Sequence, residues 1–256
     1  MPLDLLVFGP HPDDIEIGLG GTVARHVALG CRVGLCDLTL GELASNGAPE
    51  QRLAEAEAAR AVLGADWREN LRLPDGALGP EPEQIRAVVA MIRRWRPRVI
   101  AAPHDRDRHP DHVGASRLLT RAAFMAGLGR YPHGGDPWRP EWICYYFIND
   151  ADEPSFVVDV SRYYELKRRA LACHASQFAL PAGQRMNTRL TSSRFRQLVE
   201  SRDAQFGAAT GVAFAEGLIV REPIVRPDLF KQRDAGTGPG EWDALSTVDD
   251  EWPPWQ

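Results

Sequence analysis

The chain has 256 residues and a mass of 28.4 kDa, enough for one large α/β domain or two small ones. With 44% hydrophobic and 25% charged residues, it has the composition of a folded globular protein, which excludes wholesale disorder. The net charge of −5 argues against a general nucleic-acid binder, and no apolar run approaches the roughly 20 residues of a membrane span. The N-terminus shows no readable export signal and the four cysteines form no C-x-x-C pair, so we expect a cytoplasmic protein with reduced thiols.

In the first hundred residues, short apolar runs alternate with helix-forming segments. The run 3–8 ends at Gly9-Pro10 and is typical of a buried strand. In chain order the expected elements are a strand at 3–8, a helix at 22–29 after the glycine-rich stretch 18–21, a strand at 32–38, a helix at 50–63, a strand at 71–73, a helix at 82–96 and a strand at 98–102. This alternation predicts an α/β fold, a Rossmann-like, doubly wound, mostly parallel sheet with helices on both faces.

The second half of the chain has a less regular pattern. Its expected elements are strands at 142–148, 156–160 and 216–220 and helices at 162–174 and 194–209. No internal repeat is visible. We therefore expect a single domain over residues 1–230 and a C-terminal tail, 231–256, that is rich in proline, tryptophan and acidic residues.

The first motif that carries chemistry is His11-Pro12-Asp13-Asp14, directly after the first strand. His11 and Asp14 can both reach one metal ion from a strand end, because imidazole and carboxylate are ordinary ligands of Zn²⁺. Asp13 lies between them and can face the other side of a water at the metal. The alternative is that Asp13 and Asp14 only cap the following helix, whose N-terminus favours negative charge.

The second motif, residues 104–112, holds three histidines and three aspartates and follows the strand at 98–102. In open α/β sheets the ligand crevice lies outside the carboxyl ends of the strands, so we expect both motifs to meet there. Two histidines and one carboxylate, with a further position open, are typical of a hydrolytic zinc site. The alternative is a solvated polar loop with a helix cap at Asp111.

Other kinds of site fit the sequence less well. Gly18-x-Gly20-Gly21 is not the dinucleotide-binding pattern, and no P-loop or G-x-S-x-G motif is present. A structural zinc site would favour a closed, cysteine-rich set. The alternative from a different class is a nucleotide-binding regulatory module that uses the sheet and its glycine-rich turn, and the roles of Asp107 and His174 stay open.

The paired His-Pro-Asp-Asp and His-Pro-Asp-His motifs resemble those of the LmbE-like (PIG-L) zinc-dependent N-acetylglucosaminide deacetylases. The resemblance covers roughly residues 3–230. It is closest to the branch of bacillithiol biosynthesis, which deacetylates N-acetylglucosaminyl L-malate to glucosaminyl-malate and acetate; other members act on other GlcNAc conjugates or on chitooligosaccharides. The further segments that carry it are Gly18-x-Gly20-Gly21, Cys36-Asp37-Leu38-Thr39, Ser45-Asn46-Gly47, Arg52, Leu73-Pro74-Asp75, Ser176-Gln177-Phe178 and Phe214-Ala215-Glu216-Gly217.

This resemblance implies a role for most residues of the two motifs. The implied zinc ligands are His11, Asp14 and His112. The implied catalytic residues are Asp13 as general base, His109 as a cation that polarises the acetyl carbonyl, and Asp111, which orients His109. The implied substrate contacts are Arg52, Asn46 and Asp75. Some relatives carry a tyrosine where this chain has Asp107. The family often forms dimers or hexamers, which implies a homo-oligomer, and Fe²⁺ also suits the ligand set.

Arginine is concentrated near the two motifs, at Arg52, Arg106 and Arg108. A guanidinium pairs with a carboxylate through two hydrogen bonds, and malate offers two carboxylates. The sequence therefore predicts an anionic small-molecule GlcNAc conjugate as the partner, with Arg108 among its contacts, and neither nucleic acid nor membrane. The alternative is that Arg106 and Arg108 only neutralise their acidic neighbours.

Overall fold

The computed structural model describes residues 2–132, 134–179 and 186–225. The elements below all lie in a compact unit, Met1–Arg221. The predicted tail, 231–256, lies outside the described residues, so the domain boundary near residue 230 stays a prediction. None of the described helices combines the length and the apolar character needed to cross a membrane.

The core of the unit is a seven-stranded sheet with the order β3-β2-β1-β4-β5-β7-β6. Neighbours from β3 to β5 are parallel, whereas β7 runs antiparallel to both β5 and β6. This confirms the predicted doubly wound, mostly parallel sheet. The strands are β1 (Leu5–Gly9), β2 (Val33–Thr39), β3 (Trp67–Leu73), β4 (Val99–Pro103), β5 (Trp142–Tyr146), β6 (Phe156–Asp159) and β7 (Ala215–Ile219).

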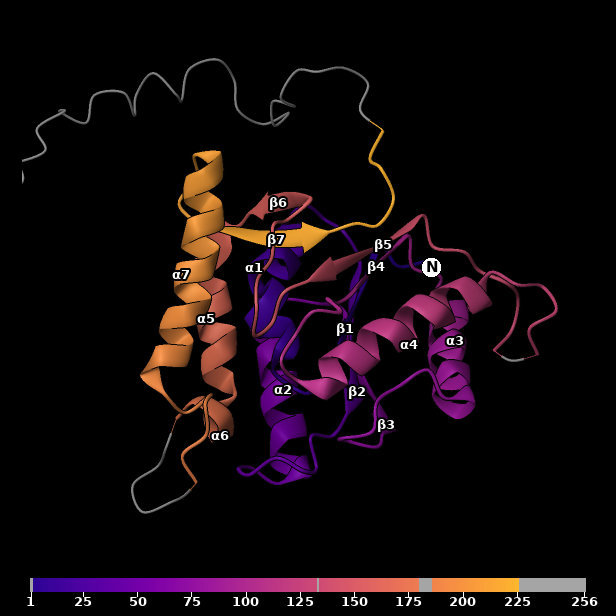
Figure 1. Ribbon diagram of the computed structural model, residues 1–256, viewed down its shortest axis with the longest axis horizontal. Coiled ribbons are helices and arrows are strands. Elements are labelled where there is room, and N and C mark those ends of the chain that lie inside the picture. Colours follow the sequence, from indigo (N-terminus) through magenta and orange to yellow (C-terminus); the bar gives the residue numbers. More distant parts are fainter. Residues whose placement is uncertain (1, 133, 180–185, 226–256) are drawn as a thin grey trace, which may run out of the picture. The chain divides into compact units, whose positions relative to one another are not determined.

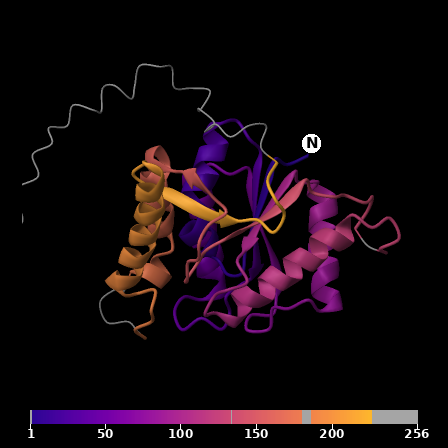
Figure 2. The same ribbon diagram turned by 45° about the horizontal axis from the view of Figure 1, so that its top comes forward.

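Helices cover both faces of the sheet, as Figures 1 and 2 show. One apolar core lies between the sheet and α1, α2, α5 and α7, and a second lies between the sheet and α3 and α4. Because both faces are covered, β1 and β2 are buried along their whole length. The helices are α1 (Asp14–Ala28), α2 (Pro49–Leu63), α3 (Pro82–Trp95), α4 (Pro110–Ala126), α5 (Tyr164–Cys173), the short α6 (Ala175–Phe178) and α7 (Ser193–Thr210), with a 3-10 turn, η1 (Ser161–Tyr163).

The chain reverses its winding direction between β1 and β4, which are neighbours at the centre of the sheet. After β1 it continues into α1 on one face, and after β4 it continues into α4 on the other. Such a switch point leaves a crevice at the carboxyl ends of the two strands, where ligands bind in open α/β sheets. Both sequence motifs begin there.

Helix α1 differs from the expected helix at 22–29 because it begins at Asp14 and includes the glycine-rich stretch. A Cβ atom on Gly18 would lie 2.2 Å from the Tyr146 ring, and one on Gly21 would lie 2.6 Å from Val160. These glycines let the helix approach the sheet and its neighbours closely, and this packing outweighs their low helix propensity.

Helix α4 is the main element that the sequence pattern did not predict. It begins at Pro110, inside the second motif, and His109 is its N-terminal flanking residue. Proline in the first turn is favourable because its missing N–H would have no partner in the helix. The second motif therefore combines a loop with a helix start, which fixes the position of His112.

Candidate metal and substrate site

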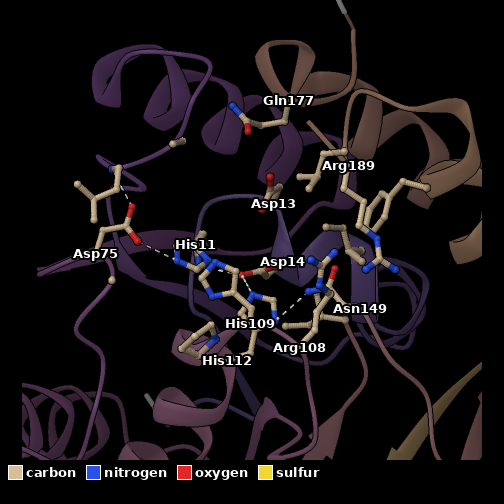
Figure 3. A pocket seen from close by; sticks show the side chains of 18 of the residues that line it. His11, Asp13, Asp14, Asp75, Arg108, His109, His112, Asn149, Gln177 and Arg189 are labelled. Carbon is tan, nitrogen blue, oxygen red and sulfur yellow. Dashed lines mark hydrogen bonds and ion pairs between the residues drawn. The ribbon is translucent and has the colours of Figure 1, made fainter. Parts of the chain in front are cut away.

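The two motifs meet at the switch point, on the floor of a cavity of about 500 Å³ (Figure 3). His11 follows β1, Asp14 begins α1, and His112 lies in the first turn of α4. Asp14 Oδ2 lies 3.1 Å from His11 Nδ1 and 3.3 Å from His112 Nε2. All three side chains are buried, and their donor atoms lie within 4.8 Å of one another. The three residues could therefore hold a metal ion.

Carboxylates hold the other ring nitrogen of His11. Its Nε2 lies 3.1 Å from Asp75 Oδ1 and 3.2 Å from Asp111 Oδ2. A proton on Nε2 satisfies both contacts and leaves the Nδ1 lone pair free for a cation beside Asp14. Carboxylates commonly orient metal-binding histidines in this way.

His112 has the same arrangement with its nitrogens exchanged. Its Nδ1 lies 3.1 Å from Asp107 Oδ1, which leaves Nε2 directed at Asp14. Asn149 fixes that carboxylate, because its backbone N–H and its side-chain amide each donate a 3.0 Å hydrogen bond to Asp107. Asp107 thus occupies a supporting position that the sequence analysis left open.

The charges of the site favour a cation between the two imidazoles. Although burial opposes the shift, Asp14 and Asp107 raise the pKa of His112 to about 9. Burial also lowers the pKa of His11, but its contacts with Asp111, Asp14 and Asp75 have the larger effect and raise that pKa well above its ordinary value. Both histidines thus lie where positive charge is stabilised, which is the electrostatic condition for a bound metal ion.

Asp13 lies beside this set in a conformation that aspartate seldom adopts, with φ 136°. Its side chain is buried, and burial raises the pKa of Asp13 to about 6 against the opposing charge of Arg52. Arg52 donates to Asp13 Oδ2 at 3.3 Å and to the carbonyls of Pro12 at 2.7 Å and Gly41 at 3.2 Å. Arg52 therefore holds the segment that carries Asp13.

His109 and Asp111 are placed differently from the expectation that the Asp111 carboxylate orients a cationic His109. The Asp111 backbone N–H donates to His109 Nδ1 at 3.2 Å, while the Asp111 carboxylate faces His11 and the amides of Gly76 and Leu78. Burial, together with the positive charge that His112 and His11 carry when they are protonated, lowers the pKa of His109. A ring that accepts at Nδ1 carries its proton on Nε2, so His109 is placed as a neutral donor.

The structure gives the expected substrate contacts other partners. Asp75 lines the cavity but bonds to His11 and to the Leu43 amide. Asn46 donates to the carbonyl of Met186 at 3.0 Å and is not among the described residues that line the cavity. Arg52 and Asp75 thus line the cavity while bonding to the protein's own groups, whereas Asn46 is not among the described residues that line it.

Two arginines, Arg108 and Arg189, line the cavity and form no ion pair within the described part of the chain. Figure 3 places them on the same side of the site, next to Asn149. Arg106 instead pairs with Asp152 and does not line the cavity. Arg189 comes from the segment before α7, where no sequence motif marked it, so the sequence analysis missed it.

His174 also stays outside the cavity. It is completely buried, and its Nε2 lies 3.3 Å from Glu16 Oε2. Glu16 in turn pairs with Arg68, which also binds Asp37. None of these four residues is among those that line the cavity.

Comparisons with known proteins agree with this site. The sequence profile of the PIG-L family, described as GlcNAc-PI de-N-acetylase, matches residues 6–123. The diacetylchitobiose deacetylase of Thermococcus kodakarensis is 31% identical over 189 residues, 68% of this chain and 70% of the relative. The 1D-myo-inositol 2-acetamido-2-deoxy-alpha-D-glucopyranoside deacetylase of Rhodococcus opacus is 29% identical over 244 residues, 70% of this chain and 83% of the relative.

A solved structure has the same architecture. It is a conserved protein of Thermus thermophilus, 39% identical, with a TM-score of 0.82 over 90% of this chain and all of the other. The shared fold, the matching profile and the extent of the sequence identity lead to one assignment. This chain belongs to the PIG-L family of de-N-acetylases.

Proposed function

We propose that the protein is a zinc-dependent deacetylase that converts N-acetylglucosaminyl L-malate into glucosaminyl-malate and acetate. The observation that carries this proposal is the composition of one cavity. Its floor has the buried donors His11, Asp14 and His112 beside Asp13. Its wall has two arginines, Arg108 and Arg189, that form no ion pair among the described residues.

The chemistry follows from the positions of these side chains. Bound at the three donors, zinc supplies Lewis acidity toward the acetyl carbonyl and the attacking water. Asp13 accepts a proton from that water and returns it to the amine as the C–N bond breaks. His109 donates from Nε2 to the oxyanion that develops on the carbonyl. Water thus adds to the acetyl carbon, and acetate and a free amine leave.

The two arginines support an anionic aglycone. A neutral sugar needs no fixed positive charge, whereas malate offers one carboxylate to each guanidinium. The relatives are named as deacetylases of diacetylchitobiose and of an inositol glycoside, so the same machinery with another GlcNAc conjugate is the alternative. Substitution of Arg108 or Arg189 distinguishes an anionic GlcNAc conjugate from a neutral one as the substrate.

The test compares kcat/KM for GlcNAc-malate, GlcNAc-inositol and methyl-GlcNAc in the wild type and in three variants. We expect a preference for malate that Arg108→Ala or Arg189→Ala reduces about 10-fold through KM, the scale of a lost charge-assisted contact. The control, Arg106→Ala, should match the wild type because Arg106 pairs with Asp152 away from the cavity. Equal wild-type values for the three substrates would refute the malate assignment and leave a general GlcNAc deacetylase.

A further inference from the structure

Helix α1 is interrupted one turn after it presents Asp14. Leu19 has φ −135° and ψ 17°, outside helical geometry. In an uninterrupted helix the Gly21 N–H would donate to the Ile17 carbonyl. Here the Gly21 N–H donates to Glu216 Oε1 at 3.0 Å, and the Ile17 carbonyl accepts from Arg202 at 2.8 Å. Two side chains from distant parts of the chain thus bind the two backbone groups that a regular helix would pair at this point.

Glu216 and Arg202 belong to a buried cluster whose charges balance. Glu216 also accepts from the Thr22 N–H at 2.7 Å and from Lys167 Nζ at 2.6 Å. Asp203 accepts from the same Lys167 at 2.6 Å and from Arg202 Nε at 3.0 Å. Burying four charges is costly unless each is paired, and here two cations face two carboxylates.

Arg202 also holds the segment that supports the other end of the metal set. Its guanidinium donates to the carbonyl of Ile148 at 2.9 Å and to that of Phe147 at 3.1 Å. The next residue, Asn149, fixes Asp107, which orients His112. One guanidinium therefore joins the turn that carries Asp14 to the segment that supports His112.

We propose that Arg202 and Glu216 are positioning residues that set the spacing between Asp14 and His112 and thereby the affinity of the site for its metal. This inference rests on the proposed metal ligands. Neither residue lines the cavity, so both act through the backbone of α1 and, for Arg202, through the segment after β5. The kink separates the ligand-bearing turn from the rest of α1, and the clamp formed by Arg202 and Glu216 fixes that turn.

The chain offers a matched control for Arg202. Arg93 is also buried, 4% exposed against 9% for Arg202, and lies in the core on the other face of the sheet. It likewise donates to backbone carbonyls, with bonds to Leu128 at 2.7 Å and Gly135 at 3.0 Å. A lysine at either position keeps the positive charge but loses the several N–H donors of the guanidinium. We therefore expect Arg202→Lys and Arg93→Lys to lower the stability of the protein by similar amounts.

The experiment measures zinc affinity, by competition with a chromophoric chelator, and thermal stability in the wild type, Arg202→Lys and Arg93→Lys. We expect both variants to lose stability, but only Arg202→Lys to bind zinc at least about 10-fold more weakly, as changes behind a metal ligand do. Glu216→Gln is the second variant and should also weaken zinc binding. Unchanged zinc affinity in Arg202→Lys and Glu216→Gln, or an equal loss in Arg93→Lys, would overturn the clamp.

The remaining outcomes are also decisive. A wild-type chain that bound no zinc would overturn the proposed function itself, whereas normal wild-type binding with unaffected variants overturns only the clamp. If neither clamp variant folds, hydrogen exchange of the wild type decides. Added zinc should slow exchange at Gly21 and Thr22 more than in α3, and equal slowing in both places would contradict the proposal.

Discussion

At the scale of single residues, carboxylates organise the site by contacting the ring nitrogen of His11 and of His112 that does not face Asp14. Asp111 and Asp75 hold His11 Nε2, and Asp107 holds His112 Nδ1. Each contact fixes which nitrogen carries the proton and which faces Asp14. A carboxylate partner also raises the basicity of the histidine that it contacts, and it thereby increases the affinity of the site for a metal ion.

Removing the charge of Asp107 tests this support. Asp107→Asn should weaken zinc binding by about 10- to 100-fold, because His112 loses the acceptor that orients it. Asp152→Asn is the matched control, since Asp152 is a nearby carboxylate that pairs with Arg106 outside the cavity. Chelator competition measures both variants. Zinc affinity equal to that of the wild type in Asp107→Asn would show that His112 needs no such partner.

The position of Arg52 predicts an effect on turnover rather than on substrate binding. Arg52→Lys should lower kcat by about 10-fold and leave KM nearly unchanged, because the guanidinium holds Asp13 and the Pro12 carbonyl. Steady-state kinetics with the preferred GlcNAc conjugate separates the two constants. A raised KM with unchanged kcat would return Arg52 to the role of a substrate contact.

At the scale of elements, the glycines of α1 are explained by close packing. Gly18 lies against the Tyr146 ring and the Phe147 carbonyl of β5 and the segment after it. An alanine in an exposed helix would stabilise the protein by about 1 kcal/mol relative to glycine. A net loss on replacing Gly18 would therefore identify packing as the dominant effect.

We expect Gly18→Ala to lower the free energy of unfolding by about 1–3 kcal/mol or more, the usual range for overpacking a core. The control is Gly79→Ala, because a Cβ at Gly79 would meet no atom within 4 Å. That variant should stay within about 0.5 kcal/mol of the wild type. Urea unfolding measures both. A stable Gly18→Ala protein would mean that α1 can move away from β5.

At the scale of the whole molecule, the topology unites the two motifs. β1 and β4 are parallel neighbours, so the residues that follow them emerge at the same edge of the sheet. For this reason the sheet and the meeting of His11, Asp14 and His112 were predictable from strand patterns and motif spacing. Each strand and each motif is recognisable from a short stretch of sequence, and the order of the parallel strands brings the two motifs together.

Other features depend on contacts that the sequence does not encode locally. Asp75 was predicted to contact the substrate, whereas a loop from elsewhere in the fold brings it to His11. Arg189 was not predicted, because no motif marks it and it reaches the cavity only through the path of the chain before α7. The glycines of α1 were predicted to form a turn, because their packing partners lie more than a hundred residues away.

The most direct test of the account measures zinc content and acetate release together in the wild type, His11→Ala, His112→Ala and Asp13→Asn. The wild type should hold one zinc ion per chain and release acetate, and both histidine variants should lose zinc and activity together. Asp13→Asn should keep its zinc while kcat falls about 100-fold or more, as for a lost general base. Full zinc content in either histidine variant, or undiminished acetate release by the zinc-free protein, would contradict the account.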